Sequence, residues 1–119
     1  MGRNKKFNTQ DVVTDMSMIF IKYGYEGTSL DDLVKETGLL RGSLYSEFGS
    51  KRGMFVAALM KNIEDDKESE ITLNLAIIAM MELTTHDNEV KQIICNWENQ
   101  IGSAILKNSQ TLGDTRDGK

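Results

Sequence analysis

Apolar side chains recur at steps of three and four residues along most of this 119-residue chain, and the chain contains no proline. That period places apolar side chains on one face of an α-helix. Without proline, nothing in the chain removes a helical hydrogen bond or kinks a helix from within. No segment alternates apolar and polar residues in the way a half-buried strand does. The sequence therefore predicts an all-α protein.

Glycines and hydroxyl residues divide this pattern into six expected helices. Helix N-caps are expected at Thr9, at Thr28 or Ser29, and at Ser50, because their side-chain oxygens accept hydrogen bonds from first-turn amides. Glycine ends the first three helices, as is common at helix C-termini. The expected helices begin near residues 9, 29, 40 and 51, and the last two cover about 70–84 and 88–108. The fifth, apolar nearly all round, is expected to be buried on more than one side.

Three helices within about 40 residues, the last two joined by a tight glycine turn, are typical of a helix-turn-helix. We therefore expect a helix-turn-helix domain over residues 1–61, joined through the fourth helix to two further helices. Residues 62–112 form the expected reduced helical region, for dimerisation or sensing, and 113–119 a disordered tail. The two further helices are expected to form a dimeric bundle.

Charge is distributed unevenly. Residues 1–61 hold nine Lys or Arg and seven Asp or Glu, whereas residues 62–119 hold five and eleven. The first half is thus slightly basic and the second clearly acidic, so only the first is suited to a polyanion. Two ordinary solvated surfaces would give the same asymmetry.

Other classes of protein find little support. The longest apolar stretch, 71–83, is too short to span a membrane, and no apolar segment follows the basic N-terminus as in a secretory signal. A single cysteine, Cys95, permits no internal disulfide, and a buried structural thiol is expected there. These features fit a cytoplasmic protein. His86 and Cys95 form no zinc or catalytic spacing, so no enzyme activity, metal or cofactor is expected.

One stretch of the chain contains a specific motif in addition to the helical periodicity. Residues 20–55 read F-x-x-x-G-Y-x-x-T-S-x-x-D-L-x-x-x-x-G-x-x-x-G-S-L-Y-x-x-F-x-S-K-x-x-M-F. This pattern resembles the N-terminal DNA-binding domain of the TetR family of bacterial transcriptional repressors, over roughly residues 9–60. The resemblance implies a homodimeric regulator that binds a palindromic operator in double-stranded DNA.

The third expected helix would be the recognition helix. Arg41 and Ser43 lie at its start, where a helix-turn-helix presents side chains to the major groove, and Gly42 would allow close approach to DNA. Arg41 is a candidate for a bidentate guanine contact, with a phosphate contact as the alternative.

The resemblance also implies phosphate contacts by Thr28 or Ser29, Tyr45 and Lys51. Their structural alternatives are helix caps for Thr28 and Ser29, packing for Tyr45 and a solvated charge for Lys51. The basic residues Arg3, Lys5 and Lys6 would form either an arm on the phosphates or a solvated terminus.

Two residues depart from the family pattern. Leu40 stands where a small or hydroxyl residue usually caps the recognition helix, so that cap is expected to be missing. Glu47 places a negative charge near the expected phosphate path. Both departures concern affinity for an operator rather than the fold.

The second half resembles the middle of the family's larger domain, which binds a ligand and dimerises. The final two helices of that domain have no counterpart beyond Leu112. Self-association through the fifth and sixth helices is therefore expected to replace them. A pocket for a small hydrophobic ligand would be lined by Met80, Met81, Cys95 and Trp97. The alternative for these residues is an ordinary core or dimer interface.

Two rival functions stay open. A regulator of this kind could bind DNA without any inducer. A helical interaction module could instead have lost operator binding and act by forming mixed dimers, which the acidic second half, Leu40 and Glu47 would suit.

Overall fold

The computed structural model of the chain describes residues 8–117, and side chains as far as residue 103. Within that range the chain forms six α-helices and no strand, which confirms the all-α prediction. The helices are α1 Thr9–Tyr23, α2 Leu30–Thr37, α3 Arg41–Phe48, α4 Lys51–Asp65, α5 Glu70–Glu82 and α6 Asn88–Asp117.

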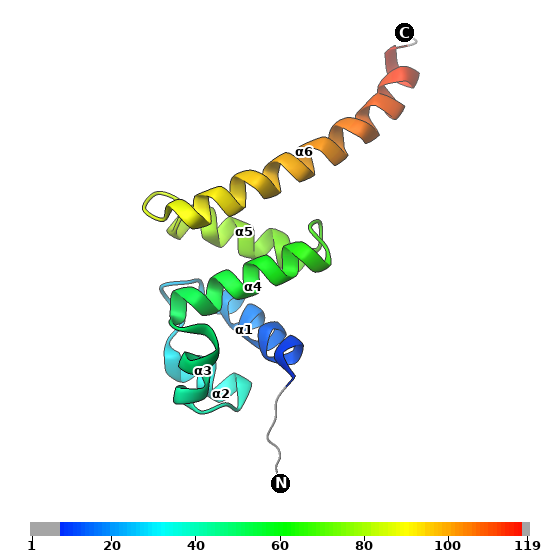
Figure 1. Cartoon of the computed structure of the whole chain (residues 1–119). Coiled ribbons are helices and arrows are strands. Elements are labelled where there is room, and N and C mark those ends of the chain that lie inside the picture. The colour runs from blue at the N-terminus through cyan, green and yellow to red at the C-terminus, as the bar shows by residue number, and fades with distance from the viewer. Residues whose placement is uncertain (1–7, 118–119) are drawn as a thin grey trace.

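The helices are arranged with the two shortest at one end (Figure 1). α1 packs against α2, α4 and α5, and α3 packs against α2 and the start of α4. α5 packs against α1, α4 and α6, and the C-terminal part of α6 extends away from the rest. The molecule is accordingly elongated, with extents of 65 × 34 × 21 Å. None of its described helices is long and apolar enough to cross a membrane.

One buried cluster connects all six helices. Its centre is aromatic: the rings of Phe20 and Phe55 meet edge to face at 5.2 Å, and Tyr25 lies 5.5 Å from Phe55. Such pairs stabilise a core beyond the area that they bury. The cluster continues through Leu75 on α5 to Val90 on α6. The end of the fold that carries α2 and α3 is therefore fixed to the helices behind it.

Most helix starts are capped as the sequence predicts. Ser29 caps α2 in a reciprocal capping box with Asp32, and the Ser50 hydroxyl accepts from the Gly53 amide. The expected cap of α1 was wrong by one residue. Asn8, not Thr9, accepts the hydrogen bond from the Gln10 amide. Asparagine and threonine are both favoured at N-caps, so the residue types alone do not distinguish the two positions.

The second half differs from expectation in three respects. α6 continues to Asp117, through residues expected to be a tail. α5 is buried on one side only, since Leu73, Ile77 and Met81 are exposed in the single chain. Cys95 is exposed rather than buried, because it lies one step along α6 from Ile94 and so faces away from the buried stripe.

Candidate nucleic-acid interface

The helix-turn-helix is built from α2, the turn at residues 38–40 and α3. Gly38 adopts φ 75°, a left-handed conformation that suits glycine, and its amide donates to the Val34 carbonyl at 2.9 Å. Leu33 on α2 and Leu44 on α3 are fully buried and anchor the two helices in the core. α3 is thereby held with its other side facing solvent.

The outward side of α3 carries the residues predicted to meet DNA. Arg41, Gly42 and Tyr45 are exposed, Tyr45 at 43%, and Ser43 is half-buried. A Cβ atom added to Gly42 would meet nothing within 4 Å. Packing within the chain therefore does not require glycine at this position. A close approach of another molecule to the exposed backbone of α3 would require it.

Arg41 already has a partner within the chain. Its guanidinium forms an ion pair with Asp31 at the start of α2, and both side chains are largely exposed. Exposed pairs of this kind contribute about 0–1 kcal/mol to stability, so Asp31 orients the Arg41 side chain but binds it weakly enough for another acceptor to replace it.

Leu40 precedes α3 without capping it. Its side chain makes no hydrogen bond to the first-turn amides and is 76% exposed, as expected from the departure at this position. The first-turn N–H groups of α3 thus lack a side-chain acceptor at the end that faces outward, where the helix dipole favours an anion. Glu47, seven residues after Leu40 on α3, is also exposed.

Lys51 is held against the turn that precedes α2. Its ammonium lies 4.6 Å from the centre of the Tyr25 ring and donates to the Thr28 carbonyl at 3.1 Å. Lys51 is therefore not simply a solvated charge. It places a positive charge beside the exposed Ser29, at the N-terminus of α4.

Thr28 has a structural role instead of the predicted phosphate contact. Its side chain is 1% exposed, and its hydroxyl donates to the Gly24 carbonyl at 2.6 Å. The hydroxyl closes the turn after α1 and faces inward, so Ser29 is the residue of this pair that can reach a ligand. The basic residues Arg3, Lys5 and Lys6 lie outside the described residues.

Sequence reasoning missed an ion cluster next to Lys51. Arg52 donates to Asp87 at 2.5 and 2.9 Å and to Glu89 at 2.7 Å, joining the start of α4 to the start of α6. The hydrogen bonds from Arg52 lower the pKa of Asp87 to about 2, and those to Asp87 and Glu89 raise the pKa of Arg52. Arg52 and Asp87 therefore stay charged near neutral pH. The Arg52 guanidinium is occupied by carboxylates at the start of α6.

Glu82 was also missed. At the last position of α5, its carboxylate accepts hydrogen bonds from the amides of Tyr25, at 3.2 Å, and Glu26, at 2.8 Å. A local signal existed, because a carboxylate in the last turn of a helix faces the negative end of the helix dipole and needs a compensating partner.

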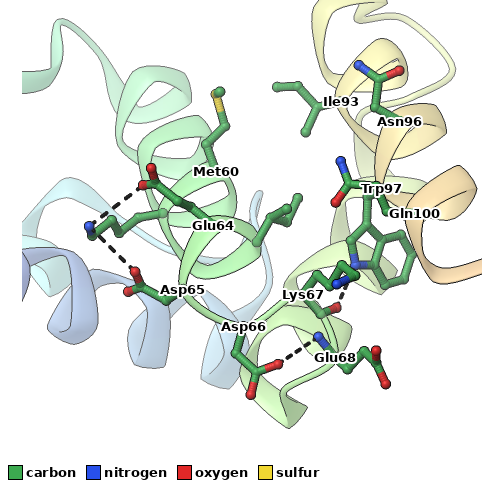
Figure 2. Close-up of a pocket in the computed structure, with 12 residues that line it drawn as sticks. Met60, Glu64, Asp65, Asp66, Lys67, Glu68, Ile93, Asn96, Trp97 and Gln100 are labelled. Atoms are coloured by element: carbon green, nitrogen blue, oxygen red, sulfur yellow. Dashed lines mark hydrogen bonds and ion pairs between the residues drawn. The ribbon is translucent and has the colours of Figure 1, made fainter. Parts of the chain in front are cut away.

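The residues predicted to line a ligand pocket do not converge. Trp97 lines a groove of about 750 Å³ between the end of α4 and α6, where its indole N–H donates to the Lys67 carbonyl at 2.8 Å (Figure 2). Met80 and Cys95 line a different hollow of about 420 Å³ between α5 and α6. Met81 lines neither and is 75% exposed. In the part of the chain that the structure describes, no three His, Cys, Asp or Glu side chains are grouped to hold a metal ion.

Two curated proteins are similar to about half of this chain. An uncharacterized HTH-type transcriptional regulator of Bacillus subtilis (strain 168), YezE, is 47% identical over 64 residues, which are 54% of this chain and 33% of the relative. The HTH-type transcriptional repressor ComR of Escherichia coli (strain K12) is 45% identical over 64 residues, which are 53% of this chain and 30% of that protein. The chain thus spans about a third of the length of these curated relatives, and no solved structure matches it.

A match to a protein family coincides with the helix-turn-helix. Residues 17–58 match the family described as bacterial regulatory proteins, tetR family. That segment runs from the middle of α1 through α2 and α3 to the middle of α4, and so includes every element of the outward surface described above. The helix-turn-helix segment of this chain is therefore similar to that of bacterial regulatory proteins of the tetR family.

Proposed function

We propose that this chain is a transcriptional repressor that binds double-stranded operator DNA through α3. The observation that carries the proposal is the bare, outward-facing start of α3. There Arg41 stands beside Gly42, with Ser29 and Lys51 on the adjoining helix N-termini. The description of one relative as a repressor supports the direction of regulation.

The side chains divide into two kinds of contact. Arg41, at the first position of α3, would enter the major groove and donate two hydrogen bonds to a guanine edge. Ser29, Tyr45 and Lys51 would contact phosphates on either side and set the position of α3 in the groove. Because phosphate contacts release counterions, affinity would fall steeply as salt rises.

The two kinds of contact predict different mutational effects. Lys51→Ala should weaken binding to every duplex about equally and reduce the slope of log affinity against log salt by about 1. Arg41→Ala should remove about 1–3 kcal/mol of preference for duplexes that the protein selects from a randomised pool, with less effect on other sequences. Fluorescence-anisotropy titrations over a range of salt would measure both.

Lys61→Ala is the matched control, because Lys61 lies on the same helix but is paired with Glu64 and Asp65 at the opposite end. It should bind DNA as the unmodified chain does. If Lys61→Ala and Lys51→Ala weaken binding equally, the Lys51 contact is wrong. If Arg41→Ala keeps full sequence preference, the base contact is wrong.

We also propose that the DNA-binding form is a homodimer. Leu73, Ile77 and Met81 follow one another at four-residue steps on α5 and are 40%, 49% and 75% exposed. Packing this row against a second copy would remove it from water, and two copies would place their α3 helices in successive major grooves, roughly 34–36 Å apart.

Sedimentation equilibrium tests the dimer. The chain should be dimeric at micromolar concentration, and Ile77→Glu should make it monomeric and weaken DNA binding, because it introduces a charge into the proposed seam. A monomer without the substitution would contradict the proposal. A stable dimer that binds no DNA would favour the alternative, an interaction module that acts through mixed dimers.

A further inference from the structure

The turn between α1 and α2 is held by a carboxylate from a distant helix. Glu82 ends α5, and its two oxygens separately accept the Tyr25 amide at 3.2 Å and the Glu26 amide at 2.8 Å. Gly24, at φ 81°, makes room for this contact, since a Cβ atom there would lie 2.9 Å from Glu82 Oε2. The turn and the carboxylate are thus fitted to each other.

The residues of this turn in turn hold Lys51. The Tyr25 ring lies under the Lys51 ammonium, 4.6 Å away, and the Thr28 carbonyl accepts its hydrogen bond at 3.1 Å. Both partners of Lys51 therefore belong to the segment whose first amides Glu82 binds. Displacing the turn would remove both partners at once and return rotamer freedom to a long side chain.

The next residue is held from the same direction. Arg52 is engaged by Asp87 and Glu89, which follow Glu82 across the α5–α6 turn. Carboxylates between residues 82 and 89 thus contact both of the first two residues of α4 or their partners. Arg52 is bound directly, and Lys51 is held by the turn that Glu82 binds. Of these three carboxylates, Glu82 is the one that binds the turn against which Lys51 is held.

We infer that Glu82 is a positioning residue for the DNA interface, acting through the Tyr25–Thr28 turn on Lys51. The inference rests on the proposed function, since it assigns Lys51 a phosphate to bind. With the turn fixed, the Lys51 ammonium stays beside Ser29 before DNA arrives, so little of its freedom is lost on binding.

Glu82→Gln distinguishes positioning from a simple charge effect. The variant keeps one acceptor oxygen and the size of the side chain but loses the second acceptor and the charge. If Glu82 acted only as a negative charge near DNA, the variant would bind DNA more tightly. Positioning predicts the opposite, a loss of about threefold to tenfold in affinity. Glu26→Gln removes the same charge from the same turn on an exposed residue, and should bind as tightly as the unmodified chain or more so.

The experiment is an anisotropy titration of a fluorescein-labelled mixed-sequence duplex at low salt, which suffices because phosphate contacts dominate non-specific binding. Four proteins form a double-mutant cycle: the unmodified chain, Glu82→Gln, Lys51→Ala and the double variant. Because Glu82 acts through Lys51, the double variant should bind no more weakly than Lys51→Ala. Thermal melting followed by circular dichroism accompanies each protein.

Each outcome decides a separate point. If Glu82→Gln binds as the unmodified chain does, or more tightly, the inference is overturned and the proposed function stands. If its loss adds fully to that of Lys51→Ala, Glu82 supports the fold generally and the positioning role is wrong. If the unmodified chain binds no duplex, the proposed function fails, and the assignment of a phosphate to Lys51 fails with it.

Discussion

Replacing Gly53 with alanine should destabilise the chain severely, with a loss of roughly 3 kcal/mol or more in the free energy of unfolding. A Cβ atom at Gly53 would lie 1.9 Å from the Phe48 carbonyl oxygen and 3.1 Å from its carbon. Both are backbone atoms at the end of α3, and they cannot rotate away as a side chain would. Relief would need movement of the whole connection between α3 and α4.

That connection has little freedom to move. Gly49 adopts φ 88° and its amide donates to the Tyr45 carbonyl, while the Ser50 hydroxyl accepts the Gly53 amide at 2.9 Å. Urea unfolding followed by the helical circular dichroism signal would measure the loss. Gly42→Ala is the matched control, because nothing lies within 4 Å of its added Cβ and the same change in an open helix stabilises by about 0.5–1 kcal/mol. Equal destabilisation by both variants would contradict the geometry at residue 53.

A second variant should separate stability from DNA binding. We expect Gly42→Glu to fold at least as stably as the unmodified chain, because glutamate is a better helix former than glycine and its charge suits the first turn of α3. The same side chain would project from the exposed start of α3 toward phosphates. Repulsion and added volume should weaken DNA binding by about a hundredfold.

Gln92→Glu supplies the comparison for this variant. It adds the same charge at an exposed position on α6, away from α3, and should leave DNA binding nearly unchanged. Thermal melting and anisotropy titration on the same samples would give both quantities. If Gly42→Glu binds duplex DNA as the unmodified chain does, α3 does not enter the groove and the proposed interface is wrong.

Local chemistry allowed much of the helix-turn-helix to be predicted from the sequence. Gly24, Gly38 and Gly49 all adopt positive φ, and each ends the helix that was expected to end there. Ser29 and Ser50 cap the helices that follow. Caps and helix-ending glycines depend on a few neighbouring residues, so they can be predicted without knowing how the rest of the chain packs.

The contacts behind the interface depend on residues far apart in the sequence. Glu82 and Tyr25 are separated by 57 positions, and Arg52 and Asp87 by 35. No periodicity relates such pairs, because the packing of α5 and α6 against the first four helices brings them together. The burial of α5 was overestimated for a similar reason: an apolar sequence does not say whether its second side meets the same chain or nothing within it.

In the proposed complex, the ion pair between Arg41 and Asp31 would affect how α3 discriminates among DNA sequences. One guanidinium nitrogen of Arg41 is paired with Asp31, so a DNA acceptor would compete with a carboxylate of the same chain for that donor. A single phosphate oxygen offers little more than Asp31 does, whereas the two acceptors of a guanine edge offer a bidentate replacement. Asp31 would therefore set a threshold that weak acceptors fail to exceed, and an acidic residue at the edge of a DNA-binding surface would increase selectivity while lowering affinity.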